Sequence, residues 1–175
     1  LCEFENGGVV DAEIGLSYEG GADQGENTVF KSFSIGNCND VAILIDCKQS
    51  VDPQSNVNLR FEGCSIDYNK QFIRFVEGLG QCRFINCYYE WMSALTTIPF
   101  DLSATAANRM LWVFDNADFV DAGGTKLYST LFKVGDKHDV RINDPWMQNI
   151  TGTGIQATTT GSPTSGPTYF TALAE

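Results

Sequence analysis

Short stretches in which apolar and polar residues alternate recur along this chain, and each ends at a residue that favours a bend. The clearest example is 81–91, where Cys82 and Phe84 share one face of an extended strand. Asn86 follows, and asparagine tolerates the left-handed backbone that bends a strand. A second alternation then begins, with Tyr89 and Trp91 on its inward face. The stretch is therefore predicted to form a strand, a one-residue corner and a second strand.

The same pattern is repeated along the chain. Its corner positions are Asn6, Asn37, Gly63, Asn86, Asn116 and Asn143, which are 23 to 31 residues apart. A second set of apolar strands lies between successive corners, at 14–16, 42–45, 72–76, 98–100 and 131–134. This spacing indicates a repeat of variable length whose extra residues lie in loops.

A period of this length, built from short strands with no amphipathic helical window, is typical of a parallel β-helix. We predict an all-β, right-handed, single-stranded parallel β-helix of about five turns over 1–149, with Asn37, Asn86 and Asn116 at equivalent corners. A Gly/Thr/Ser-rich C-terminal extension or cap is expected at 150–175. The phenylalanines expected to stack inside are Phe4, Phe33, Phe61, Phe84 and Phe114. The alternative is a β-sandwich in which the repeated corners are coincidental.

Charge and hydropathy narrow the range of partners. The 175 residues include 11 Lys and Arg against 22 Asp and Glu, for a formal net charge of −11. This balance disfavours a nucleic-acid partner and an anionic membrane surface. No apolar window is long enough for a membrane span, so membrane insertion is not expected. The chain begins at Leu1 rather than Met, and we expect it to be part of a longer chain.

The six cysteines do not follow the spacing of a metal site. There is no Cys-x-x-Cys pair, and His138 is the only histidine, so neither a structural zinc nor another metal or cofactor is expected. In the predicted register Cys38, Cys64 and Cys87 stack at one equivalent position as reduced, buried thiols, which favours synthesis in a reducing cytoplasm. His138 lacks a nucleophile motif nearby and is expected at the surface.

Taken together, the Phe-x-Asn-Cys corners, the acidic composition, the uneven loops and the Thr/Gly/Ser tail resemble the receptor-binding tailspikes of tailed bacteriophages. The shafts of tailspikes are similar to pectate lyases, and the resemblance covers about residues 1–149. It implies a homotrimer on the virion tail, made in the bacterial cytoplasm, acting extracellularly and attached to other virion tail proteins. It also implies binding, and often cleavage, of a bacterial surface polysaccharide, either capsule or O-antigen.

Two other functions remain open. One is a non-enzymatic structural or adhesive trimer tip of a fibre, and the other is a secreted polysaccharide lyase. The sequence contains no match to the calcium-binding aspartates or the catalytic arginine of a pectate lyase. An enzyme on this scaffold would be a glycoside hydrolase or a polysaccharide lyase.

Candidate site residues are sought at the outward positions of the repeat. The candidate catalytic residues are Asp67, Glu90 and Asp118, and the candidate substrate-binding residues are Tyr88, Arg83, Arg60 and Glu62. Strands that stack about 4.8 Å apart place Asp67 and Glu90 about 5 Å apart, and Glu62 and Asp115 about 10 Å apart. These separations match retaining and inverting glycoside hydrolysis respectively.

Each of these residues also has a structural interpretation. Outward carboxylates are ordinary solvated residues on a β-helix. Tyr88 is suited to stack on a sugar ring, but it could instead cover a loop or contact another subunit. The outward apolar residues Ile85, Leu111 and Val113 are expected to form a patch that a homotrimer covers.

Overall fold

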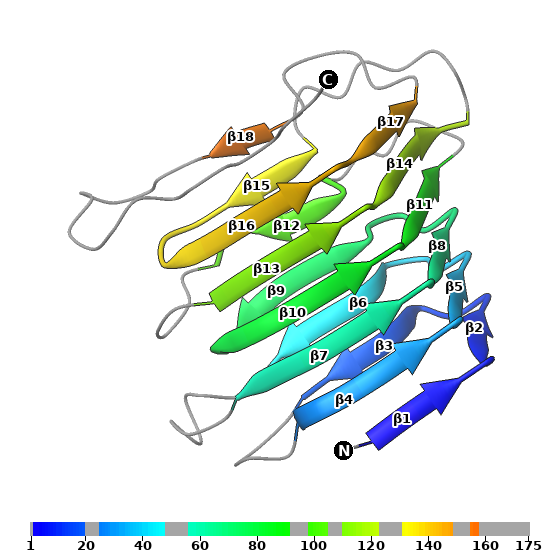
Figure 1. Ribbon diagram of the computed structural model, residues 1–175, viewed down its shortest axis with the longest axis horizontal. Helices are drawn as coiled ribbons and strands as arrows, with labels where there is room; N and C mark the ends of the chain where they lie inside the picture. Colours follow the sequence, from blue (N-terminus) through cyan, green and yellow to red (C-terminus); the bar gives the residue numbers. More distant parts are fainter. Residues whose placement is uncertain are drawn as a thin grey trace.

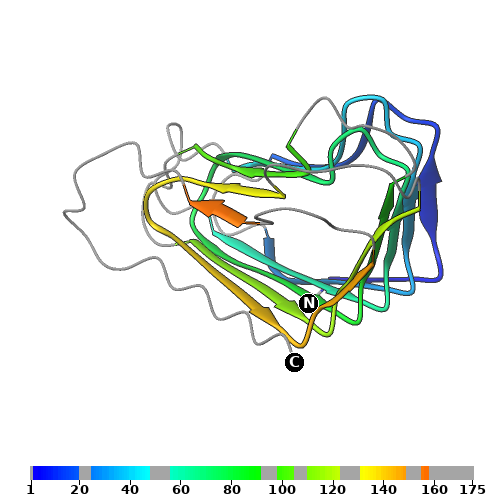
Figure 2. The same cartoon turned by 90° about the horizontal axis from the view of Figure 1, so that it is seen from above.

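The computed structural model describes residues 2–19, 25–47, 56–91, 98–104, 110–122, 131–148 and 155–157. These residues form eighteen short strands in three six-stranded sheets, in which neighbouring strands are parallel and come from successive turns. The strands climb in chain order in Figure 1, and the three sheets surround a common interior in Figure 2. The predicted parallel β-helix is confirmed.

Each turn contributes one strand to each sheet. The first sheet contains β1 (Cys2–Glu5), β4 (Gly25–Lys31), β7 (Val57–Glu62), β10 (Gly80–Ile85), β13 (Met110–Asp115) and β16 (His138–Asn143). The middle sheet contains β2 (Gly8–Val10), β5 (Ser34–Gly36), β8 (Ser65–Asp67), β11 (Tyr88–Trp91), β14 (Asp118–Asp121) and β17 (Trp146–Gln148). The third sheet contains β3 (Ile14–Tyr18), β6 (Val41–Asp46), β9 (Ile73–Glu77), β12 (Phe100–Leu102), β15 (Phe132–Val134) and β18 (Ile155–Ala157).

The third sheet matches the second set of apolar strands expected between corners. Its last strand, β18, lies within the range 150–175 assigned to the C-terminal extension, and it pairs with β15. The remainder of that range is outside the described residues. No helix in the described part of the chain is long and apolar enough to cross a membrane.

A ladder of stacked aromatic rings runs through the interior of the first sheet. Successive ring centroids lie 5.0, 4.9, 4.8 and 5.0 Å apart along the series Phe4, Phe30, Phe61, Phe84 and Phe114. Four of the five predicted rings are therefore correct, but Phe30 occupies the place predicted for Phe33. Phe33 lies after the corner and meets Phe30 edge-on at 5.5 Å.

The first corner joins the first sheet to the middle sheet. Its left-handed residues are Asn6, Ser32, Gly63, Asn86, Asn116 and Asp144. The predicted corner at Asn143 is wrong by one residue, because Ile142 is the partner of Phe114 and takes the inward position. A hydrogen bond between side-chain amides links two of these corners, with Asn116 Nδ2 donating to Asn86 Oδ1 at 2.8 Å.

The structure contains a second left-handed corner between the middle and third sheets, at Asp11, Asn37 and Tyr68. Asn37 belongs here, so placing it with Asn86 was wrong. For the same reason Cys38 is not in the column of Cys64 and Cys87, although all six cysteines are free thiols. A corner asparagine followed by cysteine occurs at both corners, and residue type alone does not distinguish them.

His138 is 3% exposed, so the expected surface position is wrong. It pairs with Met110 on an inward position of β16. Trp112 Nε1 donates to His138 Nδ1 at 2.9 Å, and His138 Nε2 lies 2.8 Å from the carbonyl oxygen of Ala104. The neutral tautomer with hydrogen on Nε2 satisfies all three groups. Burial lowers the pKa of this imidazole.

The buried His138 is expected to make the stability of the fold depend on pH. Its folded pKa lies below the unfolded value, so the unfolded chain binds the proton first and acid favours unfolding. We expect the unfolding free energy to fall as the pH drops below about 6.5, by at most about 1.4 kcal/mol per pH unit. Urea denaturation of wild type and His138→Gln between pH 7.5 and 5 measures this. Gln can bond both neighbours without titrating, so equal pH dependence in the two proteins would contradict the assignment.

Candidate functional site

The outer face of the middle sheet brings together the residues most suited to chemistry. Strand β8 pairs in register with β11, so that Ser65 lies beside Tyr88 and Asp67 lies beside Glu90. Ile66 and Tyr89, between them, face the interior and are fully buried. Neighbouring strands are about 4.8 Å apart, so the two carboxylate side chains leave adjacent backbone positions on the same face.

Glu90 is held by two tyrosines. Tyr88 Oη donates to one carboxylate oxygen at 2.7 Å, and Tyr68 Oη donates to the other at 2.9 Å. The hydrogen bond to Glu90 is the main reason that the pKa of each phenol is raised. Both phenols therefore remain proton donors to Glu90 at neutral pH.

Asp67 has a different environment. It is half-buried, and Ser65 Oγ donates to its Oδ2 at 2.6 Å. Its other oxygen, Oδ1, is buried without a hydrogen-bond partner. Burial, with a smaller contribution from the charge of Glu90, raises the pKa of Asp67. The two neighbouring carboxyl groups are thus distinguished by their surroundings.

Tyr68 is the site residue that the sequence analysis missed. It occupies the second corner with φ 57°, a conformation that is unusual for a bulky residue and often marks a functional position. Two anchors hold it: its own backbone N–H donates to the Glu90 carbonyl at 2.7 Å, and Asn69 next to it is buried. The Asn69 side chain connects to the previous turn: its Oδ1 accepts a hydrogen bond from the Cys38 N–H, and its Nδ2 donates one to the Ile35 carbonyl. The available signal was a tyrosine where equivalent turns carry Asp11 and Asn37.

The other predicted residues lie around this cluster or across the first corner from it. Asp118 lies on β14, the next strand of the same face, where it is the in-register partner of Tyr88 on β11. Arg60 and Arg83 are neighbours on the first sheet. Arg60 is ion-paired with Glu62 of its own strand, and Arg83 Nε donates to Gln81 at 3.1 Å. Asp67, Glu90, Tyr88 and Asp118 therefore share one sheet face, and the two arginines with Glu62 share another.

On the first sheet, Ile85 separates Glu62 from Asp115, so these carboxylates are two strands apart as expected. Val113, expected in an exposed apolar patch, is only 6% exposed, whereas Ile85 and Leu111 are half-buried. The expected patch is therefore smaller than the sequence indicated.

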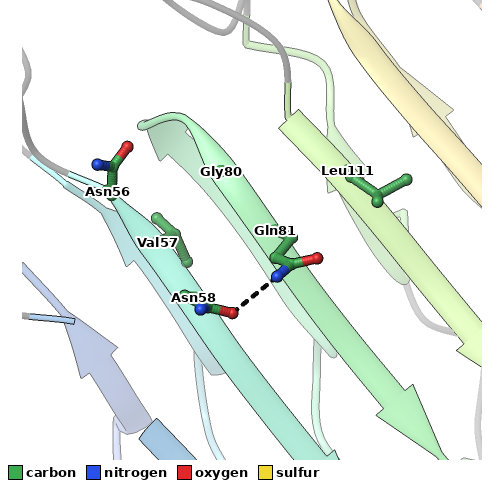
Figure 3. A pocket seen from close by; sticks show the side chains of 6 residues that line it. All are labelled: Asn56, Val57, Asn58, Gly80, Gln81 and Leu111. Atoms are coloured by element: carbon green, nitrogen blue, oxygen red, sulfur yellow. Dashed lines mark hydrogen bonds between the residues drawn. The ribbon is translucent and has the colours of Figure 1, made fainter. Parts of the chain in front are cut away.

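A shallow hollow of about 360 Å³ lies at the start of strands β7, β10 and β13 (Figure 3). Its lining residues are Asn56, Val57, Asn58, Gly80, Gln81 and Leu111. Gln81 Nε2 donates to Asn58 Oδ1 at 3.0 Å, the bond drawn in Figure 3, and Asn58 Nδ2 donates to Asn27 Oδ1 at 2.9 Å. These amides mostly satisfy one another, and no titratable side chain lines the hollow. It is therefore a weaker site for chemistry than the Asp67 and Glu90 pair.

Within the described ranges, no group of three or more His, Cys, Asp or Glu side chains could hold a metal ion. No known protein family, curated protein or solved structure matches this chain.

Proposed function

We propose that this β-helix binds a bacterial surface polysaccharide, capsule or O-antigen, on the outer face of its middle sheet and hydrolyses it there. The observation that carries the proposal is the pair of adjacent carboxyl groups, Asp67 and Glu90, flanked by Tyr68 and Tyr88. Glycoside hydrolysis requires two carboxyl groups in different protonation states, and aromatic rings beside them suit a sugar ring.

The proposed roles follow from the two environments. Asp67, whose pKa is raised mainly by burial, is the proton donor to the glycosidic oxygen. Glu90 attacks the anomeric carbon as the bond to the leaving sugar breaks, which forms a glycosyl ester. Water then attacks this ester, Asp67 takes a proton from the water, and Glu90 is released as a carboxylate. Spacing by one strand, about 4.8 Å, suits this retaining course.

The tyrosines have two roles in the proposal. Their hydroxyl groups fix the position of the Glu90 carboxylate and compensate its charge. Their rings border the place where a pyranose would lie, and Tyr68 is 44% exposed. A sugar face that stacks on such a ring is desolvated at low entropic cost, because a tyrosine side chain has few rotatable bonds.

The setting that we propose is the one implied by the resemblance to tailspikes. The chain would be a segment of a homotrimeric receptor-binding protein on a virion tail, attached to other tail proteins. Support comes from the parallel β-helix and from a carboxylate and tyrosine cluster on its outside. The half-buried Ile85 and Leu111, on the first sheet, would lie at the contact between subunits.

A binding-only tip of a fibre is the second candidate function. Both oxygens of Glu90 already accept hydrogen bonds from tyrosines, which favours a rigid recognition surface as much as a reactive nucleophile. This function shares the binding face of the first candidate and differs only in the absence of cleavage.

The Tyr88→Ala variant tests the binding face. We expect it to weaken polysaccharide binding by about 1 to 3 kcal/mol, because it removes an aromatic platform from the outer surface. The measurement is affinity for the polysaccharides that wild type selects on an array of purified capsules and O-antigens. Tyr88→Phe keeps the ring and should bind nearly as wild type. Val76→Ala, an exposed residue of the third sheet, is the control for surface changes elsewhere.

The proposal fails if wild type binds no polysaccharide on the array. It also fails if Tyr88→Ala binds as tightly as wild type while remaining folded by circular dichroism.

A further inference from the structure

We infer that the glycan lies along the stack of strands of the middle sheet, across Tyr88 and Trp146, and that its repeating unit carries no anionic group. This inference rests on the proposed function and names its substrate class and a second binding residue.

Trp146 belongs to the same outward column as Tyr88. The in-register partners Ser65, Tyr88, Asp118 and Trp146 follow one another on β8, β11, β14 and β17. Trp146 is 54% exposed, and it is the largest side chain among the exposed hydrophobic residues of the described chain. An exposed tryptophan in line with the carboxylate and tyrosine cluster adds a second flat surface to the same face.

The spacing of the two rings fits a polymer of sugars. Tyr88 and Trp146 are two strands apart, about 10 Å along the stack, which is the length of two linked pyranose rings. Asp118 lies between them, where its carboxylate can accept hydrogen bonds from sugar hydroxyl groups. A chain that stacks on Tyr88 at the carboxylate pair would therefore reach Trp146 with a sugar unit between the two contacts.

The charges on this face select the type of sugar. The outward positions of the sheet are Gly8, Val10, Ser34, Gly36, Ser65, Asp67, Tyr88, Glu90, Asp118, Val120, Trp146 and Gln148. Three of these are carboxylates and none is Lys or Arg. Uronic acids, sulfates and phosphates would be repelled by the carboxylates of Glu90 and Asp118, whereas neutral and amino sugars would not.

The test measures how the affinity of variants depends on fragment length. Wild type is first screened on purified neutral and acidic bacterial polysaccharides, and the bound polymer is then cut by partial acid hydrolysis into fragments of one to about six sugars. We expect selection of a neutral or amino-sugar polymer. Trp146→Ala should lose about 10-fold in affinity for fragments of four or more sugars and nothing for one or two, whereas Tyr88→Ala should lose affinity for both.

Two controls accompany this test. Trp146→Phe keeps an aromatic surface and should retain most of the affinity for long fragments. Val10→Ala changes a 63% exposed residue at the other end of the same face, and should have no effect.

Several results would overturn the inference. If Tyr88→Ala weakens binding but Trp146→Ala binds long fragments as wild type does, the second platform is wrong while the proposed function stands. If Trp146→Ala lowers the mass measured by light scattering and leaves the affinity of each chain unchanged, Trp146 is a subunit contact. Selection of an acidic polymer would overturn the substrate class. Binding to no polymer would overturn both this inference and the proposed function.

Discussion

The Asp67→Asn and Glu90→Gln proteins are expected to bind polysaccharide nearly as tightly as wild type and to leave it uncut. Each amide keeps the size of the side chain but cannot donate the acid proton or attack the anomeric carbon. We expect the rate of cleavage to fall by about 10²-fold or more for each variant. The release of reducing ends from the array-selected polymer, followed over time, measures this rate directly.

A third carboxylate provides a matched control. Asp101 on β12 of the third sheet is also half-buried and accepts a hydrogen bond from a serine two residues on, Ser103 Oγ, at 2.5 Å. Asp101→Asn should cleave at the wild-type rate. Cleavage by both site variants at that rate would remove the enzymatic function from this face. If the wild-type protein leaves the polymer uncut but binds it in a way that depends on Tyr88, the adhesive tip would be favoured.

Thermal unfolding separates a lost site from a lost fold in the Asp67→Asn protein. The folded pKa of Asp67 is raised, so its ionisation in the folded protein costs stability as the pH rises from about 3.9 through that raised value. Removing the ionisable group removes this cost at neutral pH. The Tm of Asp67→Asn at pH 7 should therefore equal or exceed that of wild type.

The Phe84→Ala substitution is expected to cost about 3 to 5 kcal/mol of unfolding free energy. Phe84 is fully buried between Phe61 and Phe114, with centroid distances of 4.8 and 5.0 Å. Its removal leaves a cavity in the middle of the ladder, and the register of the flanking strands limits how far the walls can relax. Urea denaturation followed by circular dichroism measures the change.

Phe4, at the end of the same ladder, allows a comparison with Phe84 in its middle. Phe4 stacks on Phe30 at 5.0 Å but is 45% exposed because the first turn has no neighbour below it among the described residues. Phe4→Ala loses one stacked face and should cost about 1 kcal/mol. Equal losses for the two variants would show that continuous stacking does not determine their stability.

The residues that face the interior in the middle turns of the β-helix were predictable, because side chains along a strand alternate between its two faces with a fixed period of two. Phe61, Phe84 and Phe114, with the corners after them, occupy the predicted places, and Tyr89 and Trp91 are buried as expected. The same alternation placed Asp67, Glu90 and Tyr88 on the outside, so most of the candidate cluster follows from local pattern and strand spacing.

The pattern of apolar residues and bends was ambiguous where one segment could be aligned with the other turns of the repeat in two ways. Residues 28–38 contain two phenylalanines that each precede a left-handed residue: Phe30 lies two residues before Ser32, and Phe33 lies four residues before Asn37. Only stacking against Phe4 and Phe61 selects Phe30, with Ser32 rather than Asn37 at the first corner. The burial of His138 likewise depends on Trp112, 26 residues earlier, whose indole N–H it accepts.

The sequence by itself therefore determined a stack of parallel strands, the residues that face its interior in the regular turns, and the two carboxylates on neighbouring turns. Tertiary structure alone decided the second corner, the hydrogen bond of Tyr68 to Glu90, and the different environment of Asp67. The physical reason is the distance along the sequence over which each interaction acts. Strand periodicity and corner preference act within a few residues, whereas the contact of Tyr68 with Glu90 joins side chains 22 residues apart and the raised pKa of Asp67 depends on burial by the assembled turns.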